Sequence, residues 1–169
     1  MKILLLGYMA SGKSTIAKNI GENLDLQPID LDDYIEDNEG CSIKDIFKNK
    51  GEIYFRKKEN FYLNELIISD KDFVLALGGG TPCYANNIDL ITKNGISIYL
   101  KASLQTLYDR LVVEKTKRPL ISDLSDKKLK EFIAKHLFER APFYERAQHT
   151  IVIDGKTTDE ITKEILGLI

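Results

Sequence analysis

The feature that most constrains the fold is a glycine-rich segment near the N-terminus, Gly7 to Ser14, which reads GYMASGKS. It matches the pattern G-x-x-x-x-G-K-[ST] and stands between an apolar run, Ile3 to Leu6, and a segment of helical periodicity, Lys13 to Leu24. Glycines allow the backbone N–H groups to turn toward an anion, and the positive end of the following helix favours negative charge there. A glycine-rich turn with a chance Lys-Ser is the alternative, but it does not account for the strand-to-helix context. The segment therefore predicts a phosphate-binding loop.

The residue types in this loop also predict which phosphate or ion each residue contacts. We expect Lys13 to reach the β- and γ-phosphates of a nucleotide, and the Ser14 hydroxyl to bind the Mg²⁺ that bridges them. The hydroxyl of Thr15 is expected near the α-phosphate. The predicted nucleotide contacts from the loop are Ala10, Ser11, Gly12, Lys13, Ser14 and Thr15.

The remaining chain alternates short apolar runs with helical segments. Further strands are predicted at Phe73 to Leu77, Ile96 to Leu100 and Thr150 to Ile153, with a weaker candidate at Pro28 to Leu31. Helices are predicted over the following ranges: 13–24, 42–68 with a break near Gly51, 86–93, 104–113, 125–140 and 158–168. This alternation is typical of an α/β sheet covered on both faces.

At 169 residues the chain has the length of one domain, 1–169. Two stretches interrupt the alternation and are expected to form a substrate-binding insertion (32–68) and a lid (113–126).

Charge and composition narrow the class of ligand. A net charge of -2 without a long basic run gives little reason to expect nucleic acid or an anionic membrane as partner. The apolar N-terminal run stops at Gly7, which is too short for a signal peptide or a membrane span, so we expect a cytoplasmic protein. Cys41 and Cys83 lack metal-type spacing and are interpreted as reduced. A small soluble ligand is the best expectation.

Other nucleotide-binding classes fit less well. A motor ATPase is expected to carry an apolar strand ending in Asp, whereas the run from Phe73 ends in Gly78-Gly79-Gly80. A GTPase needs a guanine-reading N-K-x-D element, and Asn49-Lys50-Gly51-Glu52 lacks the final Asp. The pattern favours a small kinase with a lid.

Two acids follow the weak second strand. Alternation along a strand would place Asp30 and Asp32 on the same side, near the phosphates. One could support Mg²⁺ through water while the other deprotonates an attacking hydroxyl. An acidic N-terminal cap for the next helix is an equally good local interpretation.

Three arginines are candidates for contacts with anions. Arg56 is spaced for ion pairs with Glu52 and Glu59, but its planar guanidinium could instead hold a substrate carboxylate. Arg118, in the lid, could bring positive charge to the transferred phosphoryl group, or belong to a solvated basic loop. Arg140 could be a second carboxylate ligand, or a cation at a helix C-terminus.

The glycine run is informative because of its place. Three glycines directly after an apolar strand suggest close approach of the backbone to a ligand or positive φ angles, with a plain flexible turn as the alternative. The histidines, His136 and His149, have no spacing that indicates a metal or a triad, and we interpret them as structural or exposed.

Taken together, these motifs resemble the shikimate kinase family over about residues 1 to 155. The family pattern has six elements: a P-loop, D-x-D, F-R-x-x-E, G-G-G, R-P-L and R-x-P-x-Y. They stand here, in order, as Gly7 to Ser14, Asp30 with Asp32, Phe55 to Glu59, Gly78 to Gly80, Arg118 to Leu120, and Arg140 to Tyr144.

This resemblance implies a P-loop NTPase fold with a five-stranded parallel sheet of order 2-3-1-4-5, and transfer of the ATP γ-phosphoryl group to the 3-hydroxyl of shikimate. It implies that Asp32 binds the acceptor's hydroxyls and acts as the base, and that Arg56 and Arg140 hold its carboxylate. A hydroxyl would meet the Gly79 backbone, between Gly78 and Gly80.

The resemblance also implies that Arg118 contacts ATP from the lid, that Ser14 binds Mg²⁺ with Asp30 supporting it through water, and that Arg110 stacks near adenine. Asp154-Gly155-Lys156 departs from the commoner adenine loop of the family. The family further implies a monomer. A gluconate-type or other small-molecule P-loop kinase is the nearest alternative, and a nucleotide-binding regulator without catalysis is the alternative from another class.

Overall fold

A computed structural model describes residues 1–114, 121 and 123–169. Its centre is a five-stranded parallel sheet of order β2-β3-β1-β4-β5, the order that the family resemblance implies. The strands are β1 (Lys2–Leu6), β2 (Gln27–Asp30), β3 (Phe73–Ala76), β4 (Ile96–Lys101) and β5 (His149–Val152).

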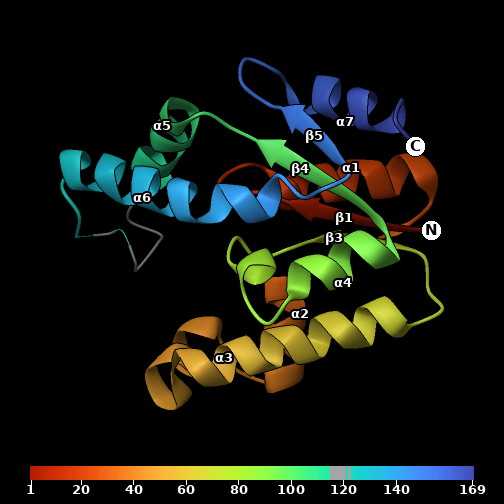
Figure 1. Cartoon of the computed structure of the whole chain (residues 1–169), viewed down its shortest axis with the longest axis horizontal. Coiled ribbons are helices and arrows are strands. Elements are labelled where there is room, and N and C mark those ends of the chain that lie inside the picture. The colour runs from red at the N-terminus through yellow and green to blue at the C-terminus, as the bar shows by residue number, and fades with distance from the viewer. Residues whose placement is uncertain (115–120, 122) are drawn as a thin grey trace.

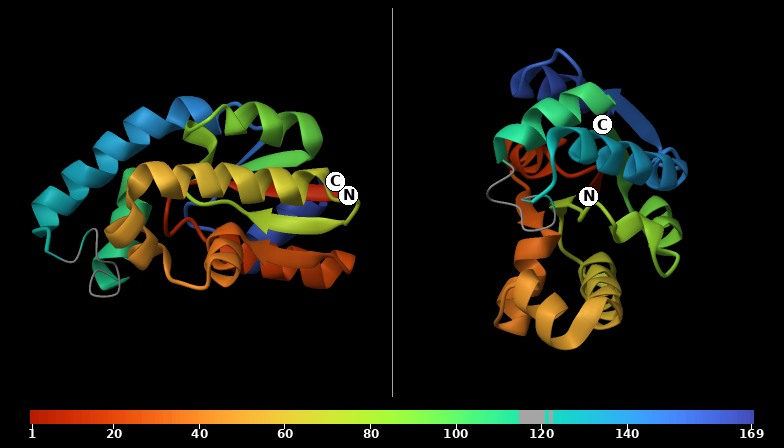
Figure 2. Two further views of the ribbon diagram at one scale, coloured as in Figure 1. Left: turned by 90° about the horizontal axis from the view of Figure 1, so that it is seen from below. Right: turned by 90° about the vertical axis from the view of Figure 1, so that its left-hand side faces the viewer.

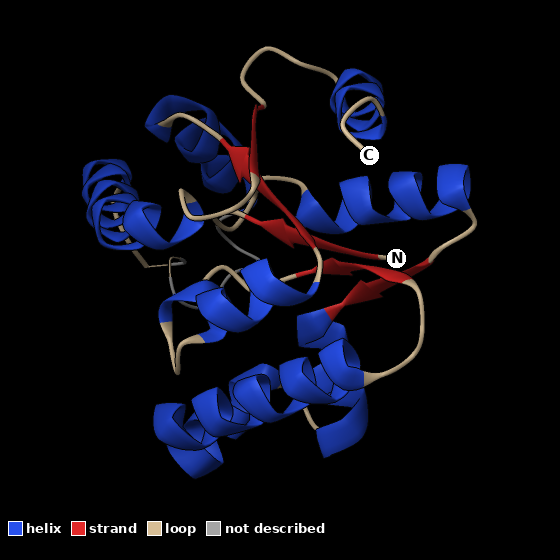
Figure 3. Cartoon of the chain, turned by 45° about the vertical axis from the view of Figure 1, so that its right-hand side comes forward, coloured by secondary structure: helices blue, strands red, loops and turns tan. Residues whose placement is uncertain are grey.

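Helices connect the strands and cover both faces of the sheet, as Figure 3 shows. They are α1 (Lys13–Leu24), α2 (Leu31–Glu39), α3 (Ile43–Ile68), α4 (Asn87–Asn94), α5 (Leu104–Glu114), α6 (Asp126–Tyr144) and α7 (Thr158–Leu166), with a short 3₁₀ helix, η1 (Thr81–Cys83). Among the described residues, no helix is long and apolar enough to cross a membrane.

Burial explains why three strands were easy to predict and one was weak. Nearly every residue of β1, β3 and β4 is buried, so these strands are continuous runs of apolar residues, as expected for a parallel sheet covered on both faces. In contrast, β2 forms an edge, is half-exposed, and contains Pro28, which cannot donate a ladder hydrogen bond.

The segment after β2 forms a helical pair at one edge of the sheet. Helices α2 and α3 pack against each other and lie at the opposite end of the molecule from α7 (Figure 1 and the right-hand view of Figure 2). Within α3, Gly51 has φ 83° and ψ 172°, which confirms the break expected there. This pair corresponds to the segment 32–68 expected to bind the substrate.

The predicted element boundaries differ from the structure in two informative places. The second strand ends at Asp30, so Asp32 lies in the first turn of α2 and not on the strand. The helix predicted over 125–140 continues to Tyr144 through Pro142. Pro142 has no N–H to donate to the carbonyl oxygen of Phe138. Phe138 is 84% exposed, so water can replace that hydrogen bond.

Candidate active site

The phosphate-binding loop joins the carboxyl end of β1 to α1. Gly7 has φ 149° and Gly12 has φ 91°, so both use backbone conformations that other residues rarely adopt. Gly12 caps α1 without offering a side chain to the first-turn N–H groups. Those donors, with the positive end of the helix, remain directed at whatever the loop surrounds.

Ala10 also has a left-handed conformation, with φ 62°. Its carbonyl oxygen accepts a hydrogen bond of 2.9 Å from Nη1 of Arg110, on α5. Arg110 is therefore at the mouth of the loop, where the family resemblance expects it to meet a nucleotide base.

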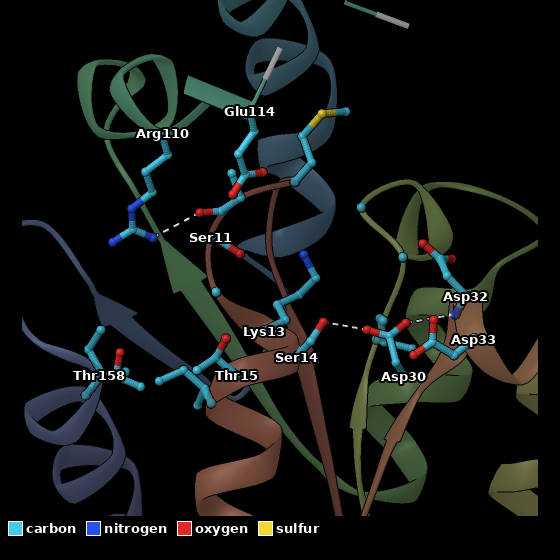
Figure 4. A pocket seen from close by; sticks show the side chains of 18 of the residues that line it. Ser11, Lys13, Ser14, Thr15, Asp30, Asp32, Asp33, Arg110, Glu114 and Thr158 are labelled. Carbon is cyan, nitrogen blue, oxygen red and sulfur yellow. Dashed lines mark hydrogen bonds between the residues drawn. The ribbon is translucent and has the colours of Figure 1, made fainter. Parts of the chain in front are cut away.

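A cavity of about 820 Å³ opens above this loop. Most of the predicted nucleotide, metal, catalytic and substrate-binding residues line it together: Ala10, Ser11, Gly12, Lys13, Ser14, Thr15, Asp30, Asp32, Gly78, Gly79 and Arg110. Figure 4 shows Lys13 and Ser14 between Arg110 on one side and Asp30, Asp32 and Asp33 on the other. The fold thus brings β1, β2, β3 and α5 to one space at the carboxyl edge of the sheet.

Lys13 is almost fully buried within its own loop. Its Nζ donates to the carbonyl oxygens of Gly7 and Tyr8 at 3.0 and 2.9 Å. These bonds hold the ammonium group beside the cavity, where a phosphate oxygen could take their place.

The side chains of Ser14 and Asp30 lie next to each other at the end of the second strand. The Ser14 hydroxyl donates to Oδ2 of Asp30, while Oδ1 of Asp30 accepts from the backbone N–H of Asp32 at 3.0 Å. Asp30 is therefore the N-cap of α2, as the local interpretation of this acid expects, and it is also a neighbour of Ser14. A hydroxyl beside a carboxylate fits a Mg²⁺ ion that takes its other ligands from phosphates and water.

Asp32 is half-buried and lines the same cavity. Burial, with the nearby carboxylates of Asp30 and Glu59, raises the pKa of Asp32 to about 6, against a smaller lowering effect of Lys13. A carboxyl group with a pKa in this range is a stronger base than an ordinary aspartate and is still largely ionised at neutral pH.

The glycine run is needed because charged side chains crowd against it. A Cβ at Gly78 would lie 3.0 Å from Oδ1 of Asp32, and one at Gly80 would lie 2.9 Å from both terminal nitrogens of Arg56. A Cβ at Gly79 would meet Nη1 of Arg140 at 3.4 Å. The three φ angles are not positive, so close approach accounts for Gly78 and Gly80, whereas the 3.4 Å distance at Gly79 is an ordinary van der Waals contact.

Arg56 and Arg140 lie outside the lining of the large cavity. Both approach the glycine turn, Arg56 at Gly80 and Arg140 at Gly79. Arg56 Nη1 donates to Oε2 of Glu59 at 2.8 Å. Glu59 is 1% exposed and also accepts from the Thr81 hydroxyl at 2.6 Å. The ion pair that the spacing predicts is therefore present, and the buried carboxylate fixes the guanidinium beside Gly80.

Arg140 reaches the turn from α6. Its guanidinium lies 5.6 Å from the ring centre of Tyr8, in the phosphate-binding loop, and the hydroxyl of Tyr144 donates to the Gly79 carbonyl oxygen. The described part of the chain thus brings two arginines and Asp32 around one short turn.

Several neighbours of the site were not predicted. Asp33, Lys156 and Thr158 line the cavity, although Lys156 belongs to the segment examined as an adenine loop. His136, interpreted as structural or exposed, pairs its Nδ1 with the Tyr8 hydroxyl at 3.1 Å. Thr81, which donates to Glu59, was also not predicted, and its place directly after the glycine run is a sequence feature that could have indicated it. The predicted lid residue Arg118 lies outside the described residues.

Comparisons with known proteins agree with this geometry. The family model described as shikimate kinase matches residues 9–169. A shikimate kinase of Flavobacterium johnsoniae is 51% identical over 169 residues, covering 99% of this chain and 98% of the relative.

Two solved structures are also similar. Shikimate kinase from Bacteroides thetaiotaomicron superposes with a TM-score of 0.93 at 31% identity, covering 99% of this chain and 97% of the other. Shikimate kinase from Acinetobacter baumannii in complex with shikimate has a TM-score of 0.89 at 33% identity, covering 99% and 91%.

Proposed function

Because the chain belongs to the shikimate kinase family, and is therefore a kinase that uses ATP to phosphorylate shikimate, we propose that the phosphoryl group goes to the 3-hydroxyl. The products are then shikimate 3-phosphate and ADP. The observation that carries the proposal is the cavity of about 820 Å³, lined by the phosphate-binding loop, Asp32 and part of a glycine turn that Arg56 and Arg140 approach from outside the lining.

The nucleotide occupies the loop side of this cavity. Backbone N–H groups at residues 10–15 and the positive end of α1 meet the phosphates, and Lys13 exchanges its two carbonyl partners for phosphate oxygens. Arg110 meets the base, and Arg118 contacts the phosphates from the segment 113–126. Ser14 and, through water, Asp30 would hold Mg²⁺, which would supply positive charge beside the β- and γ-phosphates.

The acceptor occupies the side of the glycine turn. Its carboxylate pairs with Arg56 and Arg140, while its hydroxyls bond to Asp32 and to the Gly79 backbone. Helices α2 and α3 form the substrate-binding insertion of a single kinase domain, since Asp32 lies in the first turn of α2 and Arg56 belongs to α3.

The reaction then follows from position and charge. Asp32 takes the proton of the 3-hydroxyl as that oxygen forms a bond to the γ-phosphorus, and the bond from this phosphorus to the bridging oxygen breaks to leave ADP. Lys13 and Arg118 stabilise the charge that develops on the transferred group.

An ADP-release assay with ATP and Mg²⁺ tests the acceptor directly. We expect release with shikimate and none above background with gluconate or a nucleoside monophosphate. Release with gluconate would favour the other small-molecule kinases. Binding of ATP without release for any acceptor would favour a regulator without catalysis.

The same proposal includes a cytoplasmic monomer. Both cysteines, Cys41 and Cys83, are free, as expected for a reducing compartment. Light scattering coupled to gel filtration should give the mass of one 19.2 kDa chain, and a mass near twice that value would contradict the monomer.

A further inference from the structure

The guanidinium of Arg56 contacts aromatic rings as well as carboxylates. Tyr84 follows η1, and its ring centre lies 4.2 Å from Cζ of Arg56. Planar guanidinium groups stack favourably on aromatic rings, and this contact is closer than the 5.0 Å to the ring of Phe55. Tyr84 therefore packs on Arg56 from the connection between η1 and α4.

The backbone that presents Tyr84 is strained. Ala85 and Asn86 follow it with φ angles of 49° and 56°; asparagine tolerates this left-handed conformation, whereas alanine adopts it at a cost. Such conformations persist only where the surroundings hold them, and they concentrate at functional sites. The backbone N–H of Asn87 donates to the carbonyl oxygen of Tyr84 at 2.9 Å, and the Asn87 side chain donates to Thr81 at 2.9 Å. The strained turn is thus tied to the glycine turn that precedes it.

A third contact links the tyrosine to the same arginine. The Tyr84 hydroxyl lies 3.4 Å from Oε1 of Glu52, and this carboxylate oxygen lies 3.5 Å from Nε of Arg56. Tyr84, Glu52 and Arg56 also line a separate cavity of about 530 Å³. Without the ring, the guanidinium could turn toward this second cavity and away from Gly80.

We propose that Tyr84 is a positioning residue, whose ring holds the Arg56 guanidinium in the orientation that meets the acceptor's carboxylate. This role rests on the proposed function, in which Arg56 binds that carboxylate. An arginine fixed in advance loses less side-chain freedom when the acceptor binds, so the ring acts on acceptor affinity and leaves the nucleotide site unchanged.

Steady-state kinetics of Tyr84→Leu and Tyr84→Phe test the role. We expect Tyr84→Leu to raise the KM for shikimate about 3- to 30-fold, the range of a lost guanidinium–ring contact, while kcat and the KM for ATP change less than about 2-fold. Tyr84→Phe keeps the ring and should stay near the wild type. Phe138→Leu, on the exposed side of α6, is the matched control. Since Tyr84 is 39% exposed, Tyr84→Gln is a second variant without a ring that the surface should tolerate.

Calorimetric titration of shikimate into Arg56→Ala, with and without Tyr84→Leu, shows whether the tyrosine acts through the arginine. We expect the second change to have no further effect on the Kd. An unchanged KM in the variants without a ring would overturn the role of Tyr84, as would additive losses in the double variant. A drop in kcat and in affinity for both substrates together would indicate a structural residue only, and would overturn it too. Wild-type turnover of shikimate separates these outcomes from failure of the proposed function, which would appear as no turnover in the wild type.

Discussion

At the scale of single residues, Asp32 carries the most specific chemical prediction. Its pKa of about 6 means that the ionised base is lost as the pH falls through this value, so kcat/KM for shikimate should fall below about pH 6. Asp32→Asn should reduce phosphoryl transfer by at least about 100-fold, the usual contribution of a positioned base, while ATP binding is retained. Steady-state rates from pH 5 to 8 and calorimetry with ATP measure both effects. Unchanged turnover in Asp32→Asn would remove it from the base role.

The same carboxyl group should lower the stability of the protein. Its pKa is raised from 3.8, so its contribution to folding is fully present below about pH 3.8 and is lost as the pH rises through about 6. A shift of this size corresponds to roughly 3 kcal/mol as an upper limit. Asp32→Asn should therefore raise the free energy of unfolding at pH 7 to 8, with little gain near pH 4. Urea unfolding measures the difference, and a constant gain at all pH values would contradict the assignment to this titration.

At the scale of elements, Glu39 fixes α2 against α3. It ends α2, its side chain is 6% exposed, and its carboxylate accepts from the hydroxyls of Tyr54 and Tyr62 at 2.6 and 2.8 Å. Lys58 pairs with it at 2.8 Å. Since α2 begins next to Asp32 and α3 carries Arg56, this cluster helps to set the distance between the proposed base and the proposed carboxylate ligand.

Removing the charge of Glu39 should change how stability responds to acid. Its hydrogen bonds from Lys58 and Tyr54 lower the pKa of Glu39 to about 2, so its contribution is present above about pH 4.5 and is lost as the pH falls toward 2. Glu39→Gln should be less stable than the wild type at pH 7 and should lose less stability between pH 4.5 and 2. Unfolding curves at these pH values, with Glu22→Gln on α1 as the control, measure this. Equal acid sensitivity in the two proteins would contradict the role of Glu39.

The difference between local and long-range signals explains what the sequence could and could not predict. The phosphate-binding loop, the glycine turn and most of the strands depend on short motifs and apolar runs, and they were predicted, whereas the strand order came from the resemblance to the shikimate kinase family. Asp32 was placed on a strand because the alternation of side chains was extended two residues past Asp30, the residue at which the strand ends and which caps the next helix. The contacts of Tyr84 and Glu39 join residues that lie 15 to 32 positions apart, and no local pattern reports such packing.

At the scale of the whole molecule, negative charge gathers where a polyanion must bind. Asp30, Asp32 and Asp33 line the same cavity as Lys13 and Arg110. Arg110 and Lys13 attract the phosphates of ATP, but the three carboxylates line the same cavity and repel those phosphates. Binding of ATP should therefore depend strongly on a divalent cation that offsets this repulsion.

Thermal unfolding with ATP measures this dependence on the intact protein. ATP at about 100 times its Kd in the presence of Mg²⁺ should raise the Tm by about 5–10 °C with Mg²⁺. The same ATP concentration with EDTA should raise it by clearly less, because a ligand stabilises the native state according to its affinity. Asp30→Asn should narrow the gap between the two conditions, because it removes both a carboxylate that repels ATP and the proposed partner of Ser14 in supporting the ion. Asp70→Asn, on an exposed loop after α3, should keep the wild-type gap. Equal shifts with Mg²⁺ and with EDTA in the wild type would argue against a magnesium site between Ser14 and Asp30.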